Sequence, residues 1–395
     1  MKHYIIKHDK SEINIKKKVA LIAHVNYPSL IELCFSYIEL VPEYVDIFIT
    51  TKGQDNIKRI KERIKQMKRI NIKIVVPEDR GREISGLLIA CREYLKNYDY
   101  IGFVHDKKKN QGEPFESVGR AFFDVLWENT LKNGFYINNV LTEFEKDPQL
   151  GLLAPPIPYT SHFFMVGFLG WTGCFDKTKE LAQKLNLHCN MREQIQPKIL
   201  GTTFWCRYEA LAPLFSHNWA YTDFEPEPMP IDNTISHAIE RILPYVAESQ
   251  GYKSGIIMTP EYAATYYNNY KYMFNQVALA IDEIPNSDGL EDMYATQKRL
   301  SCFCNKHSGI YIYGAGKKAK ECLEIIEDRE KIKGFIVSDG HKDKNETYLG
   351  LSITELSEIN ASDDIGIIIA LRSEYMKQVY PELIKKGFHE VERFI

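Results

Sequence analysis

Short apolar runs that alternate with helical segments dominate the first 105 residues. Each run has the length of a buried strand, and each intervening segment has the length and periodicity of a helix. The runs are residues 18–24, 46–50, 72–76 and 98–105, and the helical segments are residues 30–40, 54–69 and 84–95. Strands that alternate with helices predict an α/β fold, a Rossmann-like half with a parallel sheet covered by helices on both faces.

The alternation becomes irregular after residue 106 and resumes after residue 307. In the irregular part we expect helices at 116–131, 138–146 and 208–215, strands at 152–154 and 202–207, and a helix at 232–244 that Asp232 caps. In the last part we expect strands at 309–313, 332–337 and 365–371, and helices at 317–327, 353–359 and 375–386. This pattern predicts a first domain over 1–270, a helical linker over 271–306 and a small Rossmann-like domain over 307–395.

Composition excludes several classes of protein. The formal net charge of −3 argues against a nucleic-acid binder, because such proteins are usually strongly basic. No apolar stretch approaches the roughly 20 residues of a membrane span, and the first residues contain no apolar signal segment. The eight cysteines include no Cys-x-x-Cys pair, so we expect reduced thiols in a cytoplasmic protein.

A polar cluster follows the fourth predicted strand, at His105-Asp106-Lys107-Lys108-Lys109. In open α/β sheets ligands bind beyond the carboxyl ends of the strands. One carboxylate among several cations is typical of a diphosphate site, where Asp106 would hold a divalent metal and a lysine would offset charge. A solvated polar turn explains the same residues equally well.

Two arginines flank a glycine between the third strand and its helix, as Arg80-Gly81-Arg82. Guanidinium groups bind phosphate in a bidentate way, and a helix N-terminus adds unpaired N–H groups. The alternative is a charged turn in which Glu83 favours the helix dipole. The arginine pair gains weight because it lies on the same sheet edge as Asp106.

A third cluster, residues 225–241, is rich in proline, carboxylates and helix-starting residues. Sugar transfer with inversion needs a carboxylate that takes the proton from the acceptor hydroxyl. Asp232 is in position to do this, although a helix-capping aspartate is the commoner explanation of the pattern.

Two further segments carry weaker patterns. Gly314-Ala-Gly316-Lys-Lys-Ala319 follows a strand, opens a helix and is followed by Asp339, an order that matches the dinucleotide-binding fingerprint. Residues 52–73 hold nine Lys or Arg and two acidic residues. That basic segment would suit an anionic bilayer surface, but a charged face of a soluble helix explains it better.

The order and spacing of five blocks resemble the rhamnan synthesis protein F family of bacterial polysaccharide glycosyltransferases, over roughly residues 17–270. The blocks are VALIAHVNY at 19–27, EDRGREISGLL at 78–88, YDYIGFVHDKK at 98–108, GTTFWCRYEAL at 201–211 and EPMPIDNTISHAIERILPYVAESQGY at 227–252. The resemblance implies an A-type glycosyltransferase fold and a nucleotide-sugar donor. The C-terminal part resembles Rossmann-like modules of sugar-modifying enzymes in a general way only.

The resemblance also assigns roles to residues of this sequence. It implies Asp232 as the catalytic base, with Glu227 ranked second. The donor-binding candidates are His24, Asn26, Arg80, Arg82, Ser85, His105, Asp106, Lys107, Lys108 and His237. Thr203, Trp205 and Glu225 are the acceptor-binding candidates, with Trp205 offering a stacking face. Asp106 and His237 are the metal candidates, but His105-Asp106-Lys107 stands where the family fold has Asp-x-Asp, which leaves dependence on Mn²⁺ or Mg²⁺ open.

We therefore expect an inverting glycosyltransferase that uses dTDP-rhamnose or a UDP-hexose. Its acceptor would be a growing surface or capsular polysaccharide, free or lipid-linked, with peripheral contact to the inner membrane surface. One rival is a nucleotide- or NAD-dependent oxidoreductase that uses Gly314, Gly316 and Asp339. Another is a non-catalytic sugar-binding subunit of a polysaccharide assembly.

Overall fold

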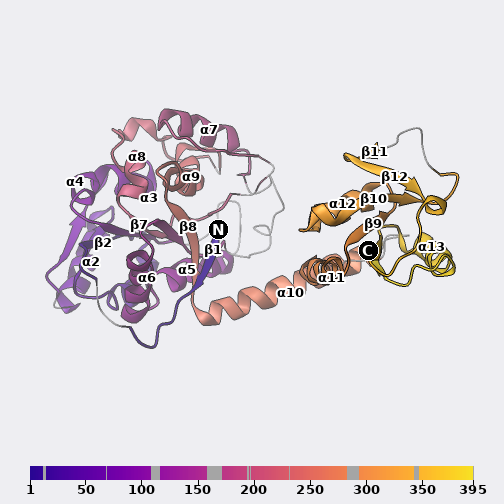
Figure 1. Cartoon of the computed structure of the whole chain (residues 1–395). Coiled ribbons are helices and arrows are strands. Elements are labelled where there is room, and N and C mark those ends of the chain that lie inside the picture. Colours follow the sequence, from indigo (N-terminus) through magenta and orange to yellow (C-terminus); the bar gives the residue numbers. More distant parts are fainter. Residues whose placement is uncertain are drawn as a thin grey trace. The chain divides into compact units, whose positions relative to one another are not determined.

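The computed structural model describes residues 1–11, 15–67, 69–107, 116–157, 171–193, 195, 197–230, 232–282, 293–341 and 347–394. The chain divides into two compact units, Met1–Tyr267 and Asn268–Ile395, and each is described by itself (Figure 1). Within the described residues no helix is both long and apolar enough to cross a membrane.

An eight-stranded sheet forms the centre of the first unit, in the order β1-β8-β6-β7-β5-β2-β3-β4. The strands are β1 (Lys2–Ile5), β2 (Val19–His24), β3 (Val45–Thr50), β4 (Ile72–Val75), β5 (Tyr100–His105), β6 (Leu150–Ala154), β7 (Phe204–Arg207) and β8 (Lys253–Met258). All paired neighbours run parallel except β7, which is antiparallel to both β5 and β6. The α/β class that the sequence predicts is confirmed.

Helices cover both faces of this sheet (Figure 1). They are α1 (Ile31–Ile38), α2 (Gln54–Met67), α3 (Arg82–Ser85), α4 (Arg92–Leu95), α5 (Glu116–Leu131), α6 (Gly134–Lys146), α7 (Phe175–Lys184), α8 (Ala212–Phe215), α9 (Ile235–Ser249) and α10 (Pro260–Asp282), which continues into the second unit. A π-helical turn, Gly86–Ala90, joins α3 to α4.

Two hydrophobic cores lie on the two faces of the sheet because strand side chains alternate. In β2, Ala20 and Ile22 belong to the core that includes residues of α7 and α9, whereas Val19 and Leu21 belong to the core that includes residues of α1, α5 and α6. The sheet is therefore buried on both faces, and its ligand-accessible regions are its edges and strand ends.

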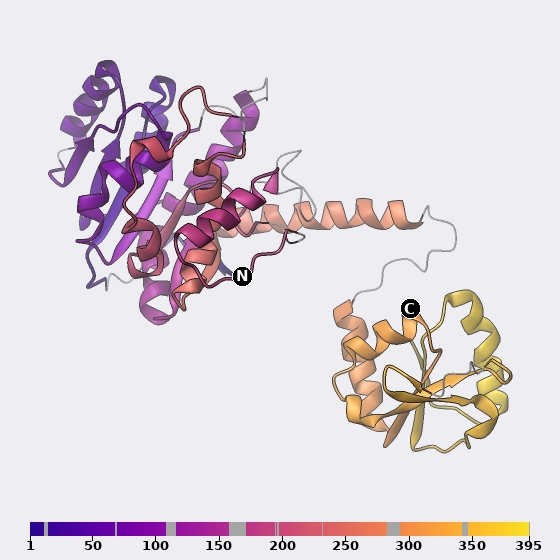
Figure 2. The same cartoon turned by 90° about the horizontal axis from the view of Figure 1, so that it is seen from above.

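The second unit contains a six-stranded sheet in the order β11-β12-β10-β9-β13-β14, parallel except for the β11–β12 pair. Its elements are α11 (Met293–Lys306), β9 (Gly309–Tyr313), α12 (Lys317–Ile325), β10 (Ile332–Val337), β11 (Thr347–Tyr348), β12 (Leu351–Glu355), β13 (Ile365–Ile369), α13 (Ser373–Lys385) and β14 (Val391–Arg393). Figure 2 shows this sheet with helices on both of its faces. The helix predicted at 353–359 is wrong, because that segment forms the end of β12 and a single 3-10 turn, Leu356–Glu358.

Candidate functional site

Three neighbouring strands end in polar residues at the carboxyl edge of the first sheet. His24 ends β2, Thr50 ends β3 and His105 ends β5, and the strand register pairs His24 with both of the others. The two histidines are 4% and 7% exposed. The ring Nδ1 of His24 lies 2.9 Å from Thr50 Oγ1. The structure thus brings together two of the predicted donor-site residues.

Asp106 follows β5 and is fixed by the loop after β2. One of its carboxylate oxygens accepts the backbone N–H of Asn26 at 2.7 Å and of Tyr27 at 2.6 Å. Asn26 is itself anchored, since its side-chain oxygen accepts the backbone N–H of Lys52 at 3.1 Å and its carbonyl accepts from Asn56 at 2.7 Å. Asn26 therefore shapes the loop, and its backbone N–H is committed to Asp106.

Burial perturbs the titrating groups at this edge. It raises the pKa of Asp106 to about 7, against the opposing effect of its backbone hydrogen bonds. It lowers the pKa of His24 to about 4, with Glu83 opposing and with His105 and Lys52 contributing. Burial alone would raise the pKa of Glu83. The nearby His105 and His24 have the larger combined effect with its other partners, so the pKa of Glu83 lies below its usual value. Strongly perturbed groups at a ligand-accessible sheet edge are typical of a functional site.

The His105 ring has one committed and one uncommitted nitrogen. Its Nδ1 lies 3.1 Å from the carbonyl oxygen of Asp106. Its Nε2 is buried and has no hydrogen-bond partner among the described residues. A buried polar atom without a partner lowers folding stability by about 1–3 kcal/mol. A histidine at this position is therefore not explained by stability alone.

Arg82 forms a bidentate ion pair with Glu227 beside this edge. Its Nε and a terminal nitrogen donate to the two carboxylate oxygens at 2.9 and 3.2 Å. The side chains are 36% and 31% exposed, so the pair is open to solvent on one side. Burial raises the pKa of Tyr27, as do Asp106 and Glu227, while Arg82 opposes. These groups therefore share one electrostatic environment.

Arg80 and Ser85 form hydrogen bonds with backbone carbonyl groups around Arg82. The Nε of Arg80 donates to the Phe224 carbonyl at 2.6 Å, which joins this loop to the segment before Glu227. Ser85 is fully buried and its hydroxyl donates to the Arg82 carbonyl at 3.0 Å. Of the predicted residues in this segment, only Arg82 presents its charge to the site.

Lys107 follows β5 and lies within electrostatic reach of α9. Its ammonium lies 4.0 Å from the centre of the Phe122 ring. Burial lowers the pKa of Lys107, and Glu240 and Glu83 oppose this shift. Since Glu240 belongs to α9, the carboxyl edge and α9 are within electrostatic reach of each other. Lys108 lies outside the described residues.

Asp232 is not the cap of α9, contrary to the sequence prediction. The helix begins at Ile235, and the N-cap is Thr234, whose hydroxyl accepts the backbone N–H of His237. Asp232 instead accepts two hydrogen bonds from Arg241, at 2.8 and 3.2 Å, and its carboxylate also accepts from the Thr172 hydroxyl. Arg241 is only 5% exposed by its side chain, so Asp232 neutralises a buried guanidinium.

His237 and Glu225 both make hydrogen bonds at the start of α9. His237 Nδ1 lies 2.7 Å from Thr234 Oγ1 and 3.7 Å from Asp232, which fixes the ring at the start of α9. Glu225 accepts the first helical N–H, that of Ile235, at 3.1 Å and pairs with Lys177 at 3.0 Å. Glu225 therefore serves the N-terminus of α9, a role that the sequence prediction gave to Asp232.

Two acceptor candidates, one just before β7 and one on it, lie in the core. Thr203 and Trp205 are both fully buried. The Trp205 indole N–H donates to the Thr130 carbonyl at 3.0 Å, and its ring fills the space over Gly102, where a Cβ would come within 2.7 Å. The prediction that Trp205 offers a stacking face is wrong, because no part of the ring reaches the surface.

The described residues do not form a metal site by themselves. No group of three or more His, Cys, Asp or Glu side chains suited to a metal ion occurs among them. Asp106 has one oxygen committed to two backbone amides, and the adjacent Lys107 is a cation. His237 contacts Thr234 and Asp232 at the start of α9. The predicted pair of Asp106 and His237 therefore does not fit a resident Mn²⁺ or Mg²⁺.

The C-terminal fingerprint has the glycine conformations that the sequence predicts, and its acid, Asp339, hydrogen-bonds within the fold. Gly314 has a φ of +116°, and a Cβ there would lie 2.8 Å from the Ala370 carbonyl. Gly316 precedes α12 and has open space around it. The Asp339 carboxylate accepts the backbone N–H of Ser357 at 2.8 Å, so it holds the turn after β12.

The sequence analysis did not include Glu83, Glu240 or Arg241 among the candidate site residues. Glu83 entered only in the alternative interpretation, as a residue that favours the helix dipole, whereas both histidines of the edge act on its carboxylate. Arg241 lies one turn after His237, and that spacing was the available signal.

Fold and site together define an α/β protein whose charged, partly buried site lies at the carboxyl edge of a mainly parallel sheet. The family model described as rhamnan synthesis protein F matches residues 1–252. The chain therefore belongs to the rhamnan synthesis protein F family, as its sequence blocks indicated.

Curated relatives and a solved structure were also found. The uncharacterized protein WxcX from two strains of Xanthomonas campestris pv. campestris is 27% identical over 233 residues, which cover 55% of this chain and 31% of the relative. The chain thus matches about a third of that protein's length. The mannosyltransferase PcManGT from Pyrobaculum calidifontis, in complex with GDP-Man and Mn²⁺, is 12% identical with a TM-score of 0.34, covering 70% of this chain and 68% of that one.

Proposed function

We propose that this chain is a glycosyltransferase that moves a sugar from a nucleotide-sugar donor to a glycan acceptor. Membership of the rhamnan synthesis protein F family supports this class of reaction. The observation that carries the proposal is the bidentate contact of Arg82 with Glu227 at the carboxyl edge of the sheet.

The Arg82–Glu227 pair has the geometry of an arginine that binds a phosphate. A guanidinium presents two parallel N–H groups that fit two oxygens of a carboxylate or of a phosphate equally well. In the free protein Glu227 occupies that position. The donor diphosphate would replace Glu227 at Arg82, with Lys107 nearby to offset the remaining charge.

Glu227, once released from Arg82, is our first candidate for the catalytic base. It would take the proton from the acceptor hydroxyl as that oxygen bonds to the anomeric carbon of the donor sugar. The bond between the anomeric carbon and the phosphate oxygen breaks, and the nucleoside diphosphate leaves with the electron pair. Attack opposite the leaving group gives inversion.

Asp232 is the second candidate and is better suited to positioning. Its carboxylate is committed to Arg241, Thr172 and the backbone N–H of Asn233. A base needs a lone pair that faces the acceptor, and these contacts use the available ones. Asp232 would hold Arg241 and, through it, the start of α9.

The donor is dTDP-rhamnose or a UDP-hexose in this proposal, and the acceptor is a surface or capsular polysaccharide made on the cytoplasmic side of the membrane. The small second unit would bind a nucleotide through Gly314 and Gly316.

The test measures donor turnover and transfer with each nucleotide sugar, with and without Mn²⁺. Glu227→Gln is expected to lower transfer by about 10²- to 10⁴-fold, the usual contribution of a general base. Binding of the nucleoside diphosphate should stay equal or tighten, because the competing carboxylate is gone. Arg82→Lys should weaken that binding at least tenfold.

Glu392→Gln is the matched control, because Glu392 also forms an ion pair with an arginine, Arg299, but lies in the other unit. It should leave transfer unchanged. Full activity of Glu227→Gln would remove Glu227 from the mechanism. The absence of turnover with every nucleotide sugar would contradict the proposed class of enzyme.

A further inference from the structure

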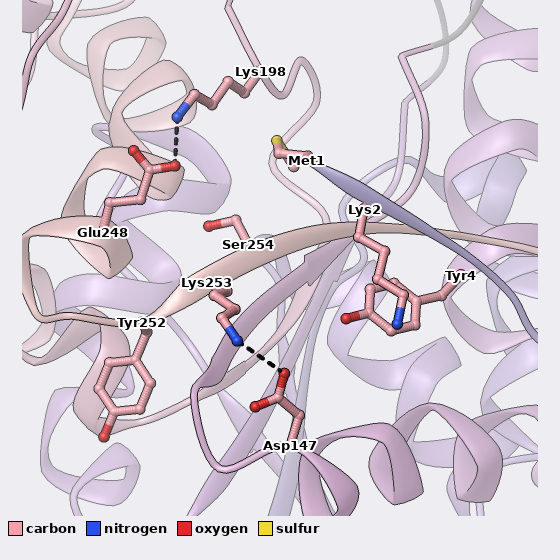
Figure 3. A pocket seen from close by; sticks show the side chains of 9 residues that line it. All are labelled: Met1, Lys2, Tyr4, Asp147, Lys198, Glu248, Tyr252, Lys253 and Ser254. Atoms are coloured by element: carbon pink, nitrogen blue, oxygen red, sulfur yellow. Dashed lines mark hydrogen bonds and ion pairs between the residues drawn. The ribbon is translucent and has the colours of Figure 1, made fainter. Parts of the chain in front are cut away.

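A second cleft lies at the amino edge of the same sheet, opposite the site described above. We call it the amino-edge cleft: it has a volume of about 470 Å³ and is lined around Tyr4, Tyr252 and Ser254 (Figure 3). Lys2 begins β1 and Lys253 begins β8, whereas His24 and His105 end their strands. Six strand residues span about 20 Å, which separates the two edges.

Two tyrosines form the apolar part of the cleft, one from β1 and one from the turn before β8. Glycines make room for them: a Cβ at Gly255 would lie 2.6 Å from the Tyr4 ring, and a Cβ at Gly151 would lie 2.5 Å from Tyr252 Cβ. Both tyrosines are partly exposed. The strands therefore hold two amphipathic rings beside the cleft at fixed positions.

Ser254 supplies an uncommitted polar group between them. It lines the cleft, is 8% exposed, and its hydroxyl makes no hydrogen bond with any residue that the structure describes. A buried hydroxyl can both donate and accept, and leaving it unpaired costs about 1–3 kcal/mol. Figure 3 shows its oxygen directed away from β8, between Lys253 and Glu248.

Two ion pairs form the polar walls. Lys253 lies 3.6 Å from Asp147, and Lys198 pairs with Glu248 (Figure 3). Lys2 lies over the Tyr4 ring, with its ammonium 4.5 Å from the ring centre. Both carboxylates are thus neutralised, and Lys2 leaves the lining with excess positive charge beside its hydrogen-bond donors and acceptors.

We propose that the amino-edge cleft binds a segment of a glycan chain. Sugar rings have apolar C–H faces that pack on aromatic rings and hydroxyl groups that both donate and accept. The tyrosines, Ser254 and the ion-paired walls match these two properties together. The volume lies within the range of roughly 300–1,000 Å³ that is usual for ligand sites.

Inorganic phosphate is the rival ligand, because the lysines of the lining outnumber its carboxylates, and the experiment therefore includes it. The inference rests on the proposed function only in naming the ligand as the acceptor glycan. On that basis, the cleft holds the polymer on one edge of the sheet while transfer takes place at the other. It would raise the affinity for long acceptors and leave donor binding unaffected.

The experiment uses the full chain and measures binding of a short rhamnan oligosaccharide by titration calorimetry and ligand-observed NMR. Inorganic phosphate is the second probe. Tyr252→Ala keeps the Cβ that packs on Gly151 and removes the ring, and Ser254→Leu fills the cleft. Each should weaken oligosaccharide binding at least tenfold and leave the thermal shift produced by nucleoside diphosphate unchanged.

Tyr44→Ala is the matched control, because Tyr44 is also partly exposed and its hydroxyl donates to Asn138 as the Tyr252 hydroxyl donates to Glu209. It should bind the oligosaccharide like the wild type. Equal binding by the Tyr252→Ala variant, no oligosaccharide binding at all, or displacement of the oligosaccharide by phosphate would each overturn the proposal.

Activity separates this inference from the proposed function. Oligosaccharide binding that depends on Tyr252, in a protein without donor turnover, supports the glycan site and removes the transferase. Donor turnover with identical KM values for a long acceptor in the wild type and the Tyr252→Ala variant overturns the glycan site and leaves the transferase in place.

Discussion

Asp106 and His24 are buried side by side, and burial shifts their pKa values in opposite directions. Asp106, with a pKa of about 7 against an ordinary 3.8, keeps a proton in the folded state that the unfolded chain has lost. His24, with a pKa of about 4 against an ordinary 6.5, lacks a proton that the unfolded chain binds. Between pH 4 and 6.5 their effects on folding stability therefore oppose each other.

Single substitutions should reveal the two opposing slopes. Stability falls with rising pH where the folded state binds more protons, so the Asp106 contribution falls by about 1.4 kcal/mol per pH unit. Asp106→Asn should therefore gain stability relative to the wild type as the pH rises from 4 to 6.5. His24→Asn should lose relative stability over the same range, because the rising contribution of His24 is removed.

Urea unfolding at several pH values measures both slopes. The double variant is the control, since its stability relative to the wild type should stay nearly constant between pH 4 and 6.5. Parallel slopes of the two single variants would show that burial does not set these pKa values.

The positions of residues were predictable where local sequence determines them. Asp106 and Arg82 follow apolar strands, so the rule that ligands bind at carboxyl ends located them. Trp205 was misjudged because Gly102 and Thr130, its partners, are distant in sequence. Asp232 was misjudged although Arg241 is only nine residues away, because the burial of that guanidinium depends on tertiary packing.

At the scale of elements, the turn that presents Arg82 depends on Gly81. Gly81 has a φ of +76°, and a Cβ there would lie 2.6 Å from the Phe224 ring. Gly81→Ala should therefore lower stability by more than the roughly 1 kcal/mol of backbone strain alone. It should also displace Arg82 and weaken nucleoside diphosphate binding.

Gly53→Ala is the matched control, because Gly53 has a φ of +80° and no atom within 4 Å of the added Cβ. Chemical unfolding should show only the strain cost there, with unchanged nucleotide binding. Equal effects of the two substitutions would mean that the Phe224 contact does not hold the turn.

Most elements of the first sheet were predictable from their apolar runs, and the exceptions have physical reasons. Strand β1 (Lys2–Ile5) is an edge strand of mixed polarity, and β8 (Lys253–Met258) has an apolar run too short to stand out. The antiparallel direction of β7 follows from its partners β5 and β6, which local sequence does not encode. The strand β12 has the apolar spacing of a short helix, and pairing with β10 decides its conformation.

At the scale of the whole molecule, each of the two units has its own cores. Residues of Met1–Tyr267 form one pair of hydrophobic clusters, and residues of the second unit form another pair. Units with separate cores generally fold alone. The carboxyl-edge site and the amino-edge cleft consist of residues of the first unit only.

We expect a chain that ends at residue 282 to fold, to bind the donor and to transfer sugar like the full protein. Residues 293–395 should fold separately, and the melting curve of the full chain should equal the sum of the two parts. Calorimetry and the transfer assay measure this. Beyond residue 267, α10 exposes Tyr272, Phe274 and Leu279, so a chain ending at residue 267 is the control for self-association through these side chains. Loss of transfer in both shortened chains, with their folding intact, would assign part of the reaction to the C-terminal sheet and favour the nucleotide-dependent oxidoreductase.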